Sequence, residues 1–301
     1  MNVTTNISRR RPYSGGVYGK KRTTTYYLGR ISLAALLLLV IFYLAFPFYW
    51  ALVSALKTEN ELIQPPATYW PQTISLENFQ NVLSSPEILR GILNSAVVAG
   101  TVVVLSLILG SFSAYALGRL HFRGKRPILY VILSMTLFPQ IAVLPGLFKV
   151  IADLGLYGNL FGLIATYLMF ALPLTTWVLM TFYRNLPDEI EQAALVDGAT
   201  FFQTFYLVLL PLTTPALVTT GLLAFIAAWN EFLFASSFTV TNPSVQTVTV
   251  AIANFRGAVS HAEPFGEIMA ATIIVTVPLL ILVLIFQRRI VYGLTAGAVK
   301  G

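Results

Sequence analysis

Long stretches without a charged side chain are the feature that most limits what this chain can fold into. A membrane-spanning helix needs about 20 predominantly apolar residues, and six such stretches occur, the fifth of which contains one acid, Glu231. Only 10% of the 301 residues are charged, whereas about 25% are charged in a typical soluble domain. The sequence therefore predicts an all-α membrane protein with six transmembrane helices, at 31–55, 92–117, 127–148, 160–183, 213–238 and 267–287.

The distribution of Lys and Arg residues predicts which side of the membrane each loop occupies. Six spans place both termini on one side, and cytoplasmic loops carry the excess of basic residues in multi-pass proteins. If the termini are cytoplasmic, only four of the 19 Lys and Arg residues lie outside: Lys57, Arg90, Lys149 and Arg256. We therefore expect a multi-pass protein of the cell (inner or plasma) membrane, with a disordered basic cytoplasmic tail at 1–29. The same bias accounts for the net charge of +7, so the expected partner is membrane lipid and not nucleic acid.

The composition excludes several kinds of active site. The chain has no cysteine, and its two histidines, His121 and His261, lie too far apart in the sequence to suggest a metal site. The stretch SGGVYGKK (14–21) has Ser14 where a phosphate-binding loop begins with glycine, and Lys21 where that loop has Ser or Thr. We therefore expect no cysteine- or histidine-based catalytic or metal site and no nucleotide or cofactor site in this chain; the family resemblance described below further implies that the chain is not an enzyme.

The connector between the fourth and fifth predicted spans is more ordered than a simple loop requires. Pro187 suits the first position of a helix, three acids follow in its first turn, and Gly198 suits its C-terminal end. Thr200 and Gln203 have the spacing of a capping box for a second helix, which Pro211 would end. We expect two short helices about a glycine elbow. One face of the first helix would combine Ile190, Ala193, Ala194 and Asp197.

On physical grounds this connector is either an interfacial linker in the headgroup region or a docking surface for a cytoplasmic partner. The segment resembles the EAA loop of permease subunits of ATP-binding-cassette importers, in which E-A-A-x-x-x-G is followed by nine residues and I-x-L-P. The matching positions are Ala193, Ala194, Gly198 and the run 208–211. Gln192 stands where the motif has glutamate, and Glu191 directly precedes it.

Four segments nearer the C-terminus extend the resemblance in the expected order. FIAAWNEFLFA (225–235) is similar to the fifth span of carbohydrate-type permeases, and QRRIVYGLTAGAVKG (287–301) to the C-terminus of the maltose-system G permease. VAIANFRG (250–257) and EPFGEIMAA (263–271) resemble the trehalose/maltose branch. The resemblance covers residues 30–301 and implies the MetI-like fold of type I ABC importer permeases, with an EAA coupling loop at 185–211 and a cytoplasmic tail at 288–301.

The resemblance also implies a function. The chain would form half of the translocation path for a di- or oligosaccharide, with the trehalose/maltose type favoured. Its partners would be a homologous second permease, two ATPase subunits that bind ATP and Mg, and an extracytoplasmic sugar-binding protein. Coupling to the ATPase would involve Glu191, Gln192, Ala193, Ala194, Asp197, Gly198 and Pro211. The C-terminal tail would contact the ATPase through Gly293, Leu294 and Thr295.

Glu231 is the one acid well inside a predicted span, and intramembrane acids are candidate functional groups. Glu231 and the adjacent Asn230 either line the translocation path or hold helices together. Asn94 either lines the path or caps a helix. Two other functions stay open: a proton-coupled secondary transporter that uses Glu231, and a membrane scaffold that recruits a cytosolic protein.

Overall fold

The computed structural model describes residues 24–255 and 264–295, which form helices and short connections, with no strand among them. The helices are α1 (Thr24–Ala55), α2 (Glu59–Ile63), α3 (Glu77–Ser84), α4 (Pro86–Gly118), α5 (Lys125–Leu137), α6 (Gln140–Asp153), α7 (Leu160–Asn185), α8 (Asp188–Val196), α9 (Phe201–Gln203), the π-helix η1 (Thr204–Leu209), α10 (Leu210–Leu212), α11 (Thr214–Trp229), α12 (Leu233–Phe238), the 3-10 helix η2 (Pro243–Val245), α13 (Val248–Ala253) and α14 (Phe265–Thr295). The chain divides into two compact units, residues 1–49 and 50–301. The described part of the first unit belongs to α1, and all other helices belong to the second.

Four helices are long and apolar enough to cross a membrane: Tyr26–Ala55 of α1, α4, α7 and Phe265–Gln287 of α14. They confirm the first, second, fourth and sixth predicted spans. Residues 24–29, which we expected in a disordered tail, are helical, and residues 1–23 lie outside the described residues. At the other end α14 continues to Thr295, so the first part of the predicted tail at 288–301 is helical as well.

The third predicted span, 127–148, is not one helix. It is divided into α5 and α6, whose axes differ in direction by 103°. The break falls at Phe138 and Pro139, which both have extended backbone angles. Proline has no N–H for the helical ladder and disfavours helical geometry in the residue before it. Pro139 therefore accounts for the bend, which the length of the uncharged run does not reveal.

The fifth predicted span, 213–238, is also divided. α11 starts after a 74° bend from the preceding helical segment, 201–212, and ends at Trp229. Residues 230–232 leave the helix, and α12 begins at Leu233. The carboxylate of Glu231 accepts the backbone N–H groups of Phe234 (2.8 Å) and Ala235 (3.0 Å), donors that the start of a helix otherwise leaves without partners. The turn is therefore stabilised by the acid that we had placed inside a continuous span. If each bent pair counts as one span, the described residues contain up to six spans, the predicted number, but the fifth then covers 201–229 and not 213–238.

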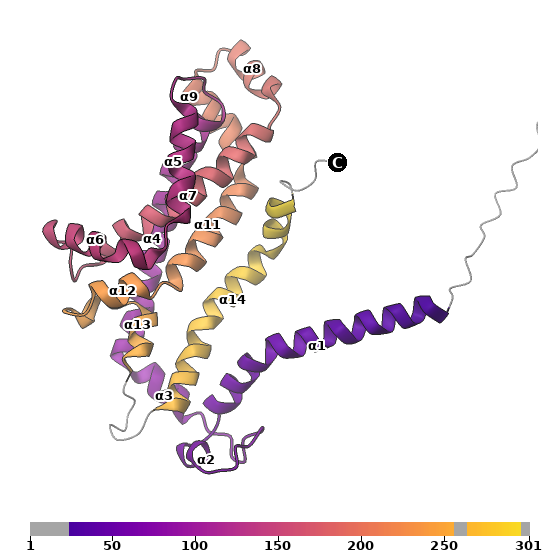
Figure 1. Ribbon diagram of the computed structural model, residues 1–301, viewed down its shortest axis with the longest axis vertical. Helices are drawn as coiled ribbons and strands as arrows, with labels where there is room; N and C mark the ends of the chain where they lie inside the picture. Colours follow the sequence, from indigo (N-terminus) through magenta and orange to yellow (C-terminus); the bar gives the residue numbers. More distant parts are fainter. Residues whose placement is uncertain (1–23, 256–263, 296–301) are drawn as a thin grey trace, which may run out of the picture. The chain divides into compact units, whose positions relative to one another are not determined.

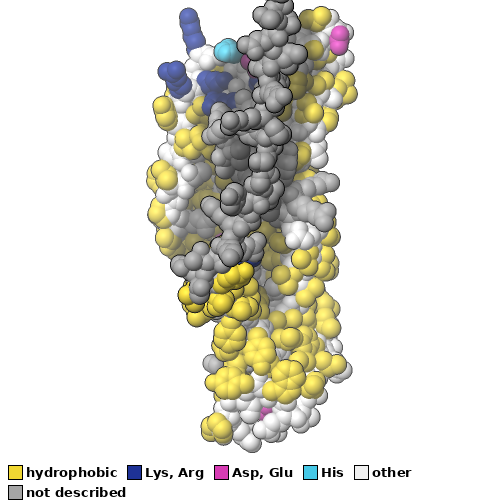
Figure 2. All heavy atoms as spheres, turned by 90° about the vertical axis from the view of Figure 1, so that its right-hand side faces the viewer, with side chains coloured by type: hydrophobic (Ala, Val, Ile, Leu, Met, Phe, Trp, Pro, Cys, Tyr) yellow, Lys and Arg dark blue, Asp and Glu magenta, His cyan; other side chains and the backbone are white. Residues whose placement is uncertain are grey.

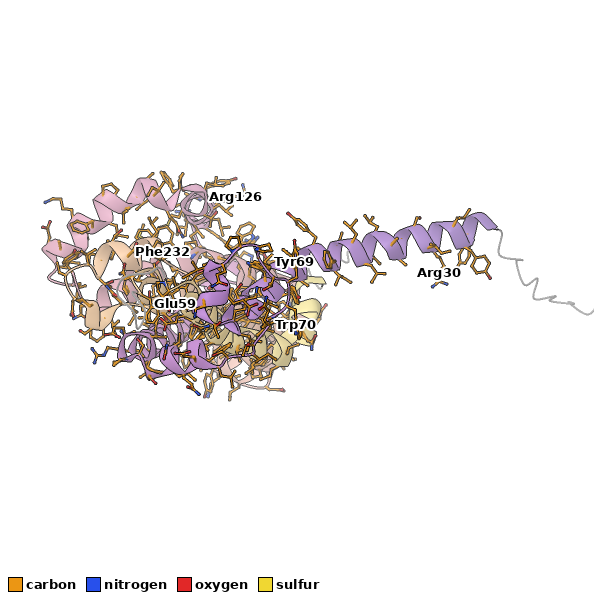
Figure 3. The ribbon with its side chains drawn as sticks, turned by 90° about the horizontal axis from the view of Figure 1, so that it is seen from below. Arg30, Glu59, Tyr69, Trp70, Arg126 and Phe232 are labelled. Carbon is orange, nitrogen blue, oxygen red and sulfur yellow. The ribbon has the colours of Figure 1, made fainter. Side chains whose placement is uncertain are left out.

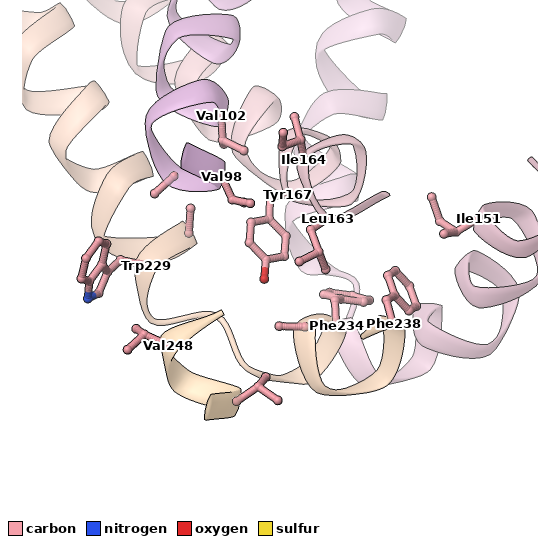
Figure 4. Close-up of a cluster of buried hydrophobic side chains, with 14 of the residues drawn as sticks. Val98, Val102, Ile151, Leu163, Ile164, Tyr167, Trp229, Phe234, Phe238 and Val248 are labelled. Atoms are coloured by element: carbon pink, nitrogen blue, oxygen red, sulfur yellow. The ribbon is translucent and has the colours of Figure 1, made fainter. Parts of the chain in front are cut away.

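The core of the second unit is formed by α4, α7 and α11. α4 lies alongside α7 over much of its length, and α11 packs against both (Figure 1). A Cβ atom at Gly110 of α4 would lie 2.6 Å from Cγ2 of Thr175 in α7, so glycine permits this close approach of two helices. One buried apolar cluster gathers around Tyr167 and joins α4 and α7 to α12 and α13 (Figure 4). A second cluster, around Tyr115 and Tyr183, lies where α4 and α7 meet η1.

The segment between α1 and α4 is folded back by polar contacts. The Nζ of Lys57 donates to the carbonyl of Thr68, whose hydroxyl donates to Glu61 at 2.6 Å. The side chain of Asn78 donates to the carbonyls of Ala55 and Lys57, at 3.0 and 2.8 Å. Figure 3 shows this end of the unit, where Tyr69 and Trp70 are exposed; Tyr and Trp are enriched at membrane–water interfaces. The short helix α3 belongs to the same segment and buries Val82.

Candidate functional site

The elbow loop, residues 185–211, has the predicted helix–glycine–helix form. α8 carries three acids in its first turn and ends just before Gly198, whose φ of 87° is in the left-handed region that glycine adopts without strain. The capping box of the next helix is complete: Thr200 N–H donates to the side chain of Gln203 at 2.8 Å, and Gln203 N–H donates to the Thr200 hydroxyl at 3.3 Å. The elbow is therefore fixed by local hydrogen bonds and by one glycine.

The second helix of the elbow differs from the prediction. It begins with α9, passes through the six-residue π-helix η1 and ends with α10 at Leu212. Pro211, which we expected to end the helix, lies within α10. Proline has no N–H to donate to the carbonyl four residues earlier. The wider π-helical turn η1 ends at Leu209, shortly before Pro211, and such turns often occur at functional sites. The chain bends only at Thr213.

The two faces of α8 differ in exposure. Gln192, Ala193 and Asp197 are exposed, and Val196 is 87% exposed. Ile190, Glu191 and Ala194 are half-buried. The face that we predicted from spacing is therefore split: Ile190 and Ala194 turn inward, whereas Ala193 and Asp197 turn outward. The outward face therefore combines the small and apolar side chains of Ala193 and Val196 with the polar side chains of Gln192 and Asp197.

Glu191 is held inside the protein. Its Oε1 accepts a hydrogen bond from the hydroxyl of Tyr115 in α4 at 3.0 Å, and its Oε2 lies 3.5 Å from Nε of Arg119. Arg119 also pairs with Asp188 and donates to the carbonyl of Leu186 at 2.7 Å. The side chains of Arg119 and Glu191 are only 7% and 15% exposed. We refer to Tyr115, Arg119, Asp188 and Glu191 as the α4–α8 brace.

The brace also reaches the second helix of the elbow. The ring of Tyr115 packs against Phe205 of η1, with centroids 5.0 Å apart, and against Tyr183 of α7 at 6.1 Å. Sequence analysis identified neither Arg119 nor Tyr115, since their partners on α8 lie 69 and 76 positions away in the chain. Beyond the brace, Arg123 in the loop before α5 and Arg126 in the first turn of α5 are exposed, and Figure 2 shows Lys and Arg side chains gathered at the α8 end.

A second candidate site surrounds Glu231. Its Oε2 accepts a hydrogen bond from the hydroxyl of Tyr167 at 2.5 Å, in addition to the two N–H groups of α12. In Figure 4 the Tyr167 hydroxyl points toward the turn between Trp229 and Phe234. Next to this turn lies a cavity of about 170 Å³, the Glu231 cavity. It is lined by Val102, Gln140, Tyr167, Phe170, Ala171, Leu174, Thr175, Thr220, Leu223, Ala224, Ala227, Ala228, Glu231 and Phe234.

The other predicted path residues are not part of this cavity. The side chain of Asn94 donates to the carbonyls of Ser244 and Gln246, at 3.0 and 2.9 Å. It thereby holds the connection before α13, and the residue that caps α4 is Ser85. The Asn230 side chain donates to the carbonyl of Ile226 at 2.9 Å and does not contact Glu231 through a hydrogen bond. Among the described residues, four polar ones share the cavity with Glu231, and sequence analysis identified none of them: Gln140, Tyr167, Thr175 and Thr220.

The remaining predictions concern the C-terminus and metals. Gly293, Leu294 and Thr295 form the last residues of α14, and residues 296–301 lie outside the described residues. Within the part of the chain that the structure describes, no group of three His, Cys, Asp or Glu residues is placed to hold a metal ion. His261 lies outside that part.

Comparison with known proteins identifies the family. Residues 106–295 match the family described as the binding-protein-dependent transport system inner membrane component. The trehalose transport system permease protein SugB of Mycobacterium tuberculosis (strain CDC 1551 / Oshkosh) is 40% identical over 263 residues, which cover 87% of this chain and 95% of that protein. The trehalose/maltose transport system permease protein MalG of Thermococcus litoralis is 40% identical over 277 residues, 91% of this chain and 98% of that protein.

A solved structure agrees in fold. A chain of a bacterial ABC transporter involved in the import of the acidic polysaccharide alginate superposes with a TM-score of 0.76 at 21% identity, covering 88% of this chain and 98% of that one. The predicted all-α permease fold is thereby confirmed. On the family match and the two full-length relatives, this chain belongs to the binding-protein-dependent transport system inner membrane components, the non-catalytic permease subunits of ABC transporters.

Proposed function

We propose that this chain is the permease subunit of an ATP-driven importer of a di- or oligosaccharide of the trehalose/maltose type. The observation that carries the proposal is 40% identity, over nearly the full length, to two permeases named for trehalose and for trehalose/maltose transport. A second permease subunit of homologous fold, two ATPase subunits that bind ATP and Mg, and an extracytoplasmic sugar-binding protein complete the transporter. The elbow loop and both termini face the cytoplasm, where the basic loop residues also lie.

The outward face of α8 is the surface that receives the ATPase. Gln192, Ala193 and Val196 are exposed on it, whereas Glu191 is occupied by the α4–α8 brace. The contact therefore depends on shape and apolar area, with Gln192 in the position where the motif has glutamate. Gly198 sets the angle between α8 and the next helix.

The α4–α8 brace gives the elbow loop a mechanical role. Arg119 stands directly after the last residue of α4 and binds the start of α8 through Asp188 and Leu186. A movement of the docked ATPase that shifts α8 is then transmitted to α4, a helix of 33 residues. A ligand can shift a two-state equilibrium only through different contacts in the two states, and ATP supplies that difference through the ATPase.

The test is reconstitution of the complete transporter in lipid vesicles. Binding-protein-stimulated ATP hydrolysis and sugar uptake are measured together with trehalose, maltose, glucose and a pentose. We expect disaccharides of the trehalose/maltose type to stimulate both activities. Stimulation by none of the sugars contradicts the proposal. Uptake that survives inactivation of the ATPase lysine but is lost in Glu231→Gln identifies a proton-coupled carrier instead, and partner binding without uptake of any solute identifies a scaffold.

A further inference from the structure

The walls of the Glu231 cavity leave room for a flat, partly apolar ligand. α11 contributes three alanines, Ala224, Ala227 and Ala228, whose small side chains keep the space open. Two aromatic rings also form part of the wall: Phe170 and Phe234 stack with centroids 5.2 Å apart and an interplanar angle of 28°. Ligand pockets commonly combine mainly apolar walls with a few placed polar groups.

The carboxylate of Glu231 has an acceptor position left for a ligand. An ionised carboxylate offers about four lone-pair sites. Among the described residues, Oε2 accepts hydrogen bonds from the Tyr167 hydroxyl and the Ala235 N–H, and Oε1 accepts one from the Phe234 N–H. The free position is therefore on Oε1, and the Tyr167 hydroxyl fixes the orientation of the group.

The amide of Gln140 is the second polar group available to a ligand. Gln140 is the first residue of α6, so the bend at Pro139 delivers it to the cavity wall. Among the described residues its side chain makes no hydrogen bond. An amide both donates and accepts, as a sugar hydroxyl does. Glu231 is the one acid among the described residues lining the cavity, so a metal ion, which needs several oxygen ligands, fits poorly.

We propose that the Glu231 cavity is a transient site for one sugar ring, with a ring hydroxyl donating to Glu231, another hydroxyl bonded to Gln140, and the C–H face of the ring on Phe170 and Phe234. The volume of about 170 Å³ is below the roughly 300 Å³ of the smallest typical pockets for whole drug-sized ligands, so one ring of a disaccharide enters and the other stays outside. Tyr167 is a positioning residue for Glu231. This inference rests on the proposed function as a sugar permease.

Filling the cavity is the sharpest test. Ala227→Phe places a ring in the cavity, and Ala96→Phe is the matched control, because Ala96 is exposed on α4 and does not line the cavity. In the reconstituted transporter we measure the number of sugar molecules taken up per ATP hydrolysed with binding protein present. We expect Ala227→Phe to lower this ratio about tenfold or more, because the ring occupies the proposed site and a tenfold loss of affinity corresponds to only about 1.4 kcal/mol, while stimulated ATP hydrolysis persists. Ala96→Phe should match the wild-type protein.

If the complex with Ala227→Phe does not assemble, a second variant, Gln140→Ala, tests the proposed sugar site. Gln140→Ala removes a side chain that is exposed at the start of a helix and makes no hydrogen bond within the described residues, so the fold should be retained. We expect its uptake ratio to fall about fivefold, the effect of losing one hydrogen bond, and a sugar lacking one hydroxyl should lose less in this variant than in the wild-type protein.

The outcomes separate the two proposals. A wild-type uptake ratio in Gln140→Ala, or in an assembled Ala227→Phe complex, overturns the sugar site and leaves the proposed function intact. Absence of uptake in the wild-type transporter with every sugar removes both. A loss that is equal in Ala227→Phe and Ala96→Phe also overturns the site, since the effect is then not specific to the cavity.

Discussion

Glu191 belongs to the proposed ATPase-coupling loop and Glu231 to the proposed sugar site, and both are held by hydrogen bonds from tyrosines. Each accepts a hydrogen bond from a tyrosine of a long helix, Tyr115 at 3.0 Å and Tyr167 at 2.5 Å. They differ in what completes the site. Glu191 lies 3.5 Å from Arg119, whereas Glu231 has no cation at ion-pair distance among the described residues and instead accepts two backbone N–H groups.

This difference shows how one residue type serves two purposes. A buried charge is costly unless it is paired or hydrogen-bonded. At the end of the molecule that carries α8, Arg119 binds two carboxylates of this helix and so fixes α8 to α4. Within the spanning region a buried cation would itself be costly, and backbone N–H groups replace it. The first arrangement uses the carboxylate to hold α8 in place, and the second leaves an acceptor for a ligand.

The largest expected effect is that of Arg119→Met. It leaves Glu191 without its cation next to a second acid, and we expect a loss of about 3 kcal/mol in the free energy of unfolding, together with uncoupling of uptake from ATP hydrolysis. Thermal unfolding of the purified complex and the uptake ratio measure the two effects. The control is Lys149→Met, which breaks an exposed ion pair with Asp153 (78% and 65% exposed) and should change stability by no more than about 0.5 kcal/mol. Equal effects of both variants contradict the brace.

The tyrosines provide a matched pair of substitutions. Tyr167→Phe removes one of three hydrogen bonds from a carboxylate that has no cation, and we expect the free energy of unfolding to fall by about 2 kcal/mol. Tyr115→Phe should lower it by about 1 kcal/mol, because Arg119 remains next to Glu191. Thermal unfolding of each variant measures the difference. Equal losses, or a larger loss for Tyr115→Phe, would show that the cation does not distinguish the two sites.

The elbow is expected to show a smaller effect that is specific to backbone geometry. The φ of 87° at Gly198 disfavours a β-branched residue, although a Cβ atom at this position would have no neighbour within 4 Å. Gly198→Val should therefore cost about 1 kcal/mol and weaken co-purification of the ATPase. Gly198→Asn is the control, since asparagine tolerates left-handed geometry better. Retention of the ATPase by the valine variant at the wild-type level would falsify the role of the elbow.

Local and distant features of the chain were predictable to different degrees. The elbow followed from the sequence because capping and glycine geometry involve neighbours within four positions. A proline such as Pro139 favours a kink but does not give its angle of 103°, and the bend at 230–232 did not follow from the sequence, because an uncharged run reports that a segment is apolar and not its direction. Those two bends bring Gln140 and Glu231 to the cavity. Tyr167 lies 64 positions from Glu231, a separation that no local pattern spans.

The smallest expected effect is a difference in salt dependence. Raising the salt concentration from 0.1 to 1 M shortens the screening length from about 10 to about 3 Å, and it acts on the brace because Asp188 is 77% exposed. We expect the free energy of unfolding of the wild-type complex to fall by a few tenths of a kcal/mol. Tyr167→Phe should show the same fall, because the site that it changes contains no ion pair for salt to screen. Arg119→Met should lose this salt dependence, since the cation is gone. If Arg119→Met kept the wild-type salt response, the charges that salt screens would lie outside the brace. The contrast between an ion-paired Glu191 and a Glu231 held by backbone N–H groups would then have no electrostatic consequence in solution.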